Sequence, residues 1–205
     1  MGGKNEHFTA LALAAGRAYM RGIQTGSGGN LSCRGPGDNT MTVKASGGSF
    51  AEVSAAGESL VVTDLYGKPL PGESGKPTRE FVLHGLLYRL LPELGGIMHC
   101  HSPWSIAWAF DHDFLPALTL HVQLKFGCDI PVVNVLSPMV REEDAPLVEA
   151  AVKNNPRPPA FILRAHGVVA LGKNVVEAEH NAELVEETAQ IALLRDFSER
   201  LSNRR

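Results

Sequence analysis

The sequence predicts one α/β domain, residues 1–205, in which layers of helices cover a mixed or antiparallel sheet. Helical and strand-like patterns alternate along the chain. Many strand candidates are short and joined by turn-forming residues rather than by long helical crossovers. With 205 residues, 44% of them hydrophobic and 20% charged, the chain is also long enough to bury one sizeable core.

The first part of the chain is predicted as a helix followed by short strands. Residues 6–22 have helical spacing, and the glycine-rich stretch QTGSGGN ends the helix. Its apolar side consists of Phe8, Leu11, Ala15, Ala18 and Tyr19. Strand candidates follow at NLSCR, TMTVKAS and SLVVTD, and the last leads through LYGK into a hairpin.

The rest of the chain alternates helices with buried strands. Residues 78–91 return to helical spacing, and GGIMHCH after them has the pattern of a buried strand. Ser102 as N-cap and Pro103 at the first helical position predict a helix over SPWSIAWAF. DIPVVNVL and AFILRAHGVVAL are predicted strands. A long C-terminal helix begins at Asn174, with Glu177 placed nearly as in a capping box.

Composition excludes several classes of partner. The net charge is −3 with no basic block, which argues against nucleic acid and anionic membranes as partners. No apolar stretch reaches the roughly 18 residues that a membrane span needs. Three widely spaced cysteines give no disulfide framework, so we expect a reducing, cytoplasmic location.

His99 and His101 are the most informative residues of the chain. Residues two apart on a strand share a face, so both imidazoles project together and suit zinc or a similar divalent ion. An acid-base pair and two separately hydrogen-bonded core histidines are the alternatives. The residues that follow do not continue as HxHxDH, which argues against a metallo-β-lactamase site. The glutamate of a cupin site is also missing, and an amidohydrolase barrel needs about 250 residues.

A zinc site needs a third ligand. His166 stands at the end of another predicted strand, beside Gly167, which allows close approach of the backbone. His84 is the rival, although a core-facing helical histidine is the preferred interpretation. Glu80 either complements a helix dipole or acts as a general acid/base beside the metal. The turns TGSGGNLS and KASGGS, with Thr78 and Arg79 at a helix start, suit anion binding.

These motifs resemble, in order, those of the class II aldolase/adducin family, which includes the zinc-dependent L-fuculose-phosphate aldolases. The matching stretches are GGNLS, ASGG, KPTRE, GGIMHCHSPWSIAWA and RAHGVVALGKNVVEA. The resemblance implies a three-layer α/β/α fold around a largely antiparallel sheet. It also implies a homotetramer with active sites between subunits. It assigns zinc, or another divalent metal, to His99, His101 and His166, and makes Glu80 the catalytic acid/base. It places a substrate phosphate against Gly29, Asn30, Ser46, Gly47, Thr78 and Arg79.

The resemblance implies a zinc-dependent aldolase that cleaves a small sugar phosphate or hydroxy-ketone phosphate through a metal-stabilised enediolate. The alternatives are a 3-oxo-tetronate 4-phosphate decarboxylase or a methylthioribulose-phosphate dehydratase of the same family. A non-enzymatic module like the adducin head is a further alternative, but adducin heads lack the three histidines. The chain departs from some fuculose-phosphate aldolases at Arg79, where they carry serine. It also lacks their proton-donating tyrosine near LTLHVQL, which leaves His121 or water for that role.

Overall fold

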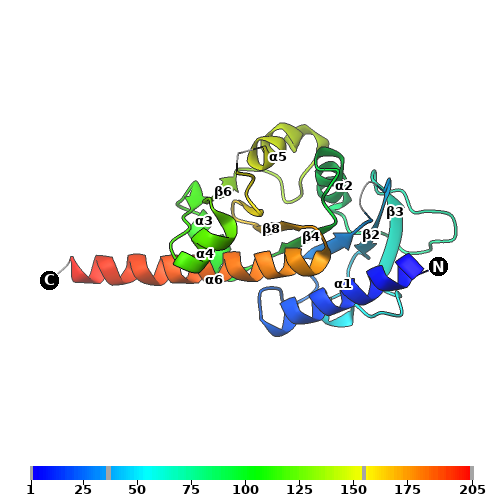
Figure 1. Ribbon diagram of the computed structural model, residues 1–205, viewed down its shortest axis with the longest axis horizontal. Coiled ribbons are helices and arrows are strands. Elements are labelled where there is room, and N and C mark those ends of the chain that lie inside the picture. The colour runs from blue at the N-terminus through cyan, green and yellow to red at the C-terminus, as the bar shows by residue number, and fades with distance from the viewer. Residues whose placement is uncertain (1, 36–37, 154–155, 204–205) are drawn as a thin grey trace.

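An eight-stranded sheet forms the centre of the computed structural model, which describes residues 2–35, 38–153 and 156–203 (Figure 1). The strand order is β3-β2-β1-β4-β8-β7-β6-β5. The strands are β1 (Asn30–Cys33), β2 (Thr40–Lys44), β3 (Leu60–Asp64), β4 (Gly96–Cys100), β5 (Phe114–Leu115), β6 (Ile130–Val133), β7 (Ala160–Leu163) and β8 (Gly167–Gly172). Neighbours pair antiparallel except β6 and β7, which confirms the predicted mixed, largely antiparallel sheet.

Helices cover both faces of the sheet. They are α1 (Gly2–Met20), α2 (Phe81–Leu90), α3 (Pro103–Ala109), α4 (Leu120–Phe126), α5 (Ala145–Val152) and α6 (Val175–Ser202), with short 3-10 turns at Phe50–Glu52 and Glu142–Asp144. One core joins α1, α3, α4 and α6 to the sheet, and a second joins α2 and α5 to the opposite face (Figure 1). In the part of the chain that the structure describes, no helix has both the length and the apolar character to cross a membrane.

The alternation of β4 decides which layer receives its histidines. Met98 and Cys100 enter the core formed with α6, whereas Ile97 enters the core formed with α2. His99, two residues after Ile97, therefore faces the α2 layer. His99 and Cys100 therefore point to opposite faces of the sheet, as the sequence predicted. The site must consequently form between the sheet and the start of α2.

The stretch AFILRAHGVVAL differs from the predicted strand. It folds as an antiparallel hairpin of β7 and β8. Ala165, in the turn, has a left-handed backbone with φ 55°, and the amide of His166 donates to the Leu163 carbonyl. The alanine in RAHG gives no sign of this turn, because an alanine rarely adopts that conformation.

The helix predicted from residue 78 begins three residues later. The Thr78 amide donates to the Lys44 carbonyl at 2.9 Å, so the segment before α2 extends along β2 instead of coiling. Glu80 is consequently the N-cap residue of α2 rather than part of its first turn.

Tyr19, expected on the buried side of α1, is 42% exposed. Helices α4 and α5 were not predicted.

Arg34 fastens the C-terminal end of α2 to β1. Its buried guanidinium donates to the backbone carbonyls of Tyr88, Leu91, Pro92 and Leu94 at 2.8–3.0 Å. We expect Arg34→Met to lower the free energy of unfolding by about 3 kcal/mol or more, because several buried acceptors lose their donor. Urea denaturation measures this effect. The exposed Arg195→Met is the control, with an expected loss of no more than about 0.5 kcal/mol; equal losses would contradict this role of Arg34.

Candidate metal and substrate site

Three histidines and one glutamate meet where β4 ends and β8 begins. His99 lies on β4, His101 follows it, His166 lies in the β7–β8 turn, and Glu80 caps α2. One ligand atom of each residue lies within 4.8 Å of those of the others. The imidazole centroids are 4.7–5.0 Å apart, so the three rings surround one point. The antiparallel pairing of β4 with β8 creates this arrangement, because it brings the end of one strand to the start of the other.

The hydrogen bonding of His99 leaves one ring nitrogen free. Its Nδ1 is 2.9 Å from the Val168 carbonyl, which can only accept, so Nδ1 donates and Nε2 carries the lone pair. Both His99 Nε2 and Glu80 Oε1 are buried without a hydrogen-bond partner. His99 Nε2 is 3.3 Å from Glu80 Oε2, and His166 Nε2 is 3.7 Å from Glu80 Oε1. Such orphaned atoms are costly, and a divalent cation among them would satisfy both. The residues present therefore fit a metal ion.

A glycine beside His166 permits the close contact between the strands. Gly167 has φ 156°, and a Cβ atom built there would lie 2.2 Å from the Cys100 carbonyl oxygen. Any other residue would push the β8 end away from β4 and separate His166 from His101. The structure thus shows the close approach of the backbone that was expected at this glycine.

His84 lies outside the cluster, in the buried layer beneath it. Its Nδ1 is 2.6 Å from Ser32 Oγ, and its Nε2 contacts Asn30 Oδ1. This is the core-facing arrangement preferred over a ligand role. Asn30 also donates from Nδ2 to Glu80 Oε2 at 2.6 Å, so much of its side chain is already engaged. A phosphate role for Asn30 stays a prediction that depends on its remaining amide hydrogen.

Burial makes the folded protein sensitive to acid. It lowers the pKa of His84 and of His99 to about 3, whereas an unfolded histidine titrates near about 6.5. Between these values the unfolded chain binds more protons, so stability falls as pH drops below about 6.5. The expected slope for the metal-free protein is up to about 1.4 kcal/mol per pH unit for each such histidine. Urea unfolding with a chelator between about pH 7 and pH 5 measures it. Unchanged stability across this range would contradict the effect of burial on these two rings.

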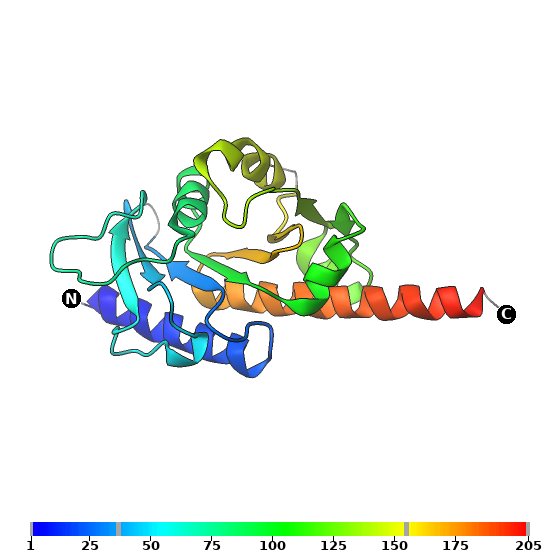
Figure 2. The same cartoon turned by 180° about the vertical axis from the view of Figure 1, so that it is seen from behind.

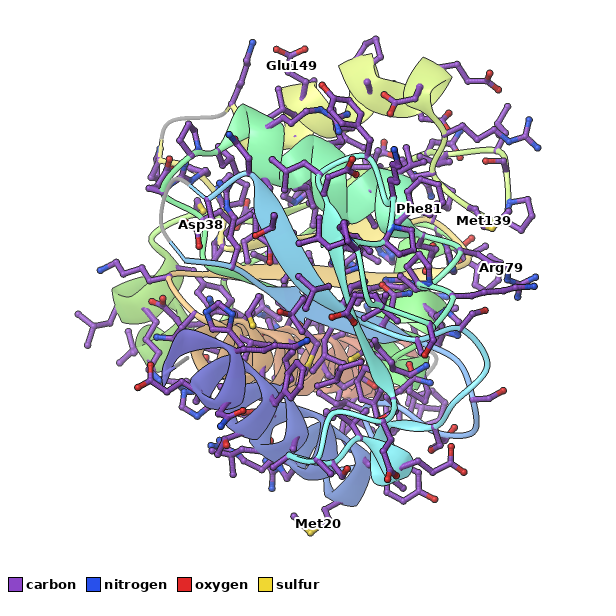
Figure 3. The ribbon with its side chains drawn as sticks, turned by 90° about the vertical axis from the view of Figure 1, so that its right-hand side faces the viewer. Met20, Asp38, Arg79, Phe81, Met139 and Glu149 are labelled. Atoms are coloured by element: carbon purple, nitrogen blue, oxygen red, sulfur yellow. The ribbon has the colours of Figure 1, made fainter. Side chains whose placement is uncertain are left out.

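A cleft of about 120 Å³ opens beside the cluster, and all six residues expected to bind phosphate line it, as do Glu80, His101 and His166. The six are Gly29, Asn30, Ser46, Gly47, Thr78 and Arg79. Arg79 is exposed at the outer edge of the molecule, and Met139, which also lines the cleft, lies near it (Figure 3). The structure thus brings both predicted sets of residues together at one place.

Lys44 also lines the cleft, although the sequence did not single it out. Its side chain is buried, and its ammonium donates to the Ala45 carbonyl at 3.2 Å. Burial lowers the pKa of this ammonium, while Glu52 opposes the shift. A lysine that ends an otherwise uncharged strand, shortly before a glycine-rich turn, was the signal in the sequence. An anion in the cleft would gain a nearby positive charge from it.

Comparisons with known proteins agree with this geometry. Residues 9–193 match the model of the family described as Class II Aldolase and Adducin N-terminal domain. L-fuculose-1-phosphate aldolase from Thermus thermophilus is 25% identical, with a TM-score of 0.77 over 97% of this chain and 98% of that one. YgbL from Klebsiella pneumoniae, a candidate aldolase/epimerase/decarboxylase, is 29% identical, with a TM-score of 0.76 over 93% and 90% of the two chains. An aldolase II superfamily protein from Pseudomonas syringae is 21% identical and shares the fold, with a TM-score of 0.80 over 93% and 75%.

Proposed function

The chain belongs to the Class II Aldolase and Adducin N-terminal domain family, and we propose that it is a zinc-dependent aldolase. Its substrate would be a small sugar phosphate or hydroxy-ketone phosphate. The observation that carries the proposal is the meeting of a three-histidine, one-glutamate cluster with a cleft lined by the residues that are expected to bind phosphate. The fuculose-phosphate aldolase likeness supports the same substrate class.

His99, His101 and His166 would hold the ion. Three imidazoles with room for a further ligand are the donor set that a catalytic zinc prefers. When bound, zinc would supply a Lewis acid for the enediolate that carbon–carbon cleavage leaves behind. The buried Nδ1 contact of His99 keeps its Nε2 turned toward the cluster.

Glu80 would move the proton to and from the enediolate carbon. Its Oε2 accepts from Asn30 and lies near His99, while its Oε1 has no hydrogen-bond partner and faces His166. An oxygen in that position is available to a substrate proton. Ser46, Gly47 and Lys44 would hold the phosphate at the other side of the cleft, since backbone amides, hydroxyls and an ammonium are its usual partners.

Decarboxylation is the second candidate, because the 29% identical YgbL is named for aldolase, epimerase and decarboxylase activities. Decarboxylation of a 3-oxo acid phosphate and dehydration of methylthioribulose phosphate also pass through enolate-type anions. One site can therefore serve any of these reactions. A purely adducin-like module is the non-enzymatic alternative.

A substrate panel, assayed with and without a chelator, tests the proposal. Chelator-sensitive release of dihydroxyacetone phosphate from a ketose 1-phosphate is the expected result. Release of carbon dioxide from a 3-oxo acid phosphate would replace aldolase by decarboxylase. Absence of metal-dependent turnover on every hydroxy-ketone and 3-oxo acid phosphate would leave the non-enzymatic module.

We further propose a homo-oligomer, most simply a tetramer. Several large apolar side chains are strongly exposed, among them Leu120 at 84%, Leu124 at 88%, Leu136 at 91% and Phe197 at 62%. The C-terminal part of α6 also extends beyond the rest of the molecule (Figure 2). Light scattering should give a mass several times the 22.0 kDa of one chain, and Leu124→Glu should lower it. A fully active monomer at micromolar concentration would contradict this.

A further inference from the structure

A continuous chain of buried hydrogen bonds runs from Tyr88, in the last turn of α2, to the Glu80 carboxylate. Tyr88 Oη is 2.8 Å from Ser32 Oγ, which is 2.6 Å from His84 Nδ1. His84 Nε2 contacts Asn30 Oδ1, and Asn30 Nδ2 is 2.6 Å from Glu80 Oε2. Asn30 and Ser32 share one face of β1, while Glu80, His84 and Tyr88 recur every four residues along α2, so the two elements interleave.

The chemistry of these groups gives the chain only one direction. A carboxylate oxygen can only accept, so the Asn30 amide nitrogen faces Glu80 and its oxygen faces His84. His84 Nε2 must therefore carry the hydrogen. Burial lowers the pKa of His84 to about 3, which keeps the ring neutral and leaves Nδ1 as an acceptor. Ser32 must give its single hydrogen to Nδ1, so Tyr88 must donate to Ser32.

All five side chains are buried, with exposed fractions of 6% or less. Reversing any one link would leave a donor facing a donor or an acceptor facing an acceptor out of reach of water, which is costly. The Asn30 amide cannot turn over without losing two bonds at once. Its orientation, and with it the position of Glu80 Oε2, is therefore fixed by residues that never reach the cleft.

We propose that His84, oriented by Ser32 and Tyr88, is a positioning residue that acts through Asn30 to hold the Glu80 carboxylate with Oε2 between Asn30 and His99 and with Oε1 toward His166. This inference rests on the proposed role of Glu80. It also explains why a fully buried histidine, which is not one of the clustered ligands, lies one turn below Glu80. Fixing one oxygen leaves the other free to exchange a proton without a change of rotamer.

The first test reads the hydrogen positions directly and needs no substrate. Nitrogen-15 NMR of the histidine rings in the zinc-loaded protein should show His84 as a neutral ring protonated at Nε2 between about pH 6 and pH 8. His84→Gln identifies the signal by its loss. A ring protonated at Nδ1, or a charged ring, would overturn the proposal.

The second test measures proton transfer with dihydroxyacetone phosphate as the probe. In heavy water, the zinc-loaded protein should exchange hydrogen for deuterium at the hydroxymethyl carbon beside the carbonyl. His84→Leu removes both ring contacts and should lower the exchange rate at saturating probe by about 10- to 100-fold, with little change in the half-saturating concentration. His84→Gln can still donate to Asn30 and should recover much of the rate. Ser32→Ala should give a smaller loss in the same direction if His84→Leu fails to fold.

Thr188→Val is the matched control. It removes an equally buried hydroxyl that bonds the Leu184 carbonyl on α6, across the sheet from the chain of bonds, and should leave exchange unchanged. In a Glu80→Gln background, His84→Leu should cause no further loss, because it acts only through Glu80. Full additivity, or normal exchange in a folded, zinc-loaded His84→Leu protein, would overturn the inference.

The results that would contradict the proposed function differ from those that would contradict the positioning role of His84. Normal exchange in Glu80→Gln, or none in the wild type, would reject the role of Glu80 as a proton carrier. The NMR experiment would still decide the direction of the chain. A large loss in Glu80→Gln with none in His84→Leu or Ser32→Ala would reject the positioning role alone.

Discussion

Turnover of the zinc-loaded Glu80→Gln protein is expected to fall by about 10² to 10⁴, the usual contribution of a general acid/base. Glutamine keeps the shape and can still accept the Asn30 amide hydrogen that now reaches Glu80 Oε2. The fold and the zinc content should therefore stay close to those of the wild type. The measurement is kcat on the substrate that the panel identifies, together with zinc analysis of the same sample.

The competing explanation of Glu80 is favourable interaction with the α2 dipole. That explanation predicts a loss of stability of about 0.3–1 kcal/mol and near-normal turnover. Glu80 makes no side-chain cap hydrogen bond with α2, which already weakens it. Glu177→Gln is the matched control, since Glu177 occupies the first turn of α6, outside the cluster. It should show the dipole effect without loss of kcat. Near-normal kcat in both variants would reject a catalytic Glu80.

His101→Ala is expected to remove the bound metal from purified protein and to abolish metal-dependent turnover. Partners that only orient a ligand already contribute about 10- to 100-fold in metal affinity or activity, so loss of a direct ligand should cost at least that much. His101 is also partly exposed and follows β4, so its removal disturbs little packing. Elemental analysis and a chelator competition measure the change in affinity.

The control for this variant is His180→Ala. His180 is half exposed on α6, outside the cluster, and its Nε2 is 3.7 Å from Glu179 Oε2. Metal content and turnover should match those of the wild type. If His101→Ala keeps one ion per chain and full activity, the three-histidine assignment is wrong.

Patterns within single elements predicted much of this structure. The alternation of side chains along a strand predicted that His99 on β4 and His101 just after it would project together. Local residue preferences predicted that α3 would begin at Pro103 and that α6 would follow Asn174, which accepts a hydrogen bond from the Glu177 amide. These features depend on near neighbours in the chain, so a sequence carries them. The ordered motifs also predicted the family and the layered fold.

Features that depend on distant partners could not be predicted in this way. Asn30 and Glu80 are 50 residues apart, and nothing near either residue reveals that they share a hydrogen bond. The later start of α2 arises from a backbone contact between Thr78 and Lys44. The same contact region buries Lys44 beside the cleft. Such features follow from which strands become neighbours, and only the folded sheet determines that.

The proposed function requires that His99, His101 and His166 together hold a metal ion beside Glu80. Diffraction from crystals of the zinc-loaded protein, collected on both sides of the zinc absorption edge, would locate this ion. We predict one anomalous peak per chain, within about 2.0–2.1 Å of a ring nitrogen of each histidine. A map without a peak at this point, or with the zinc bound only elsewhere on the chain, would contradict it.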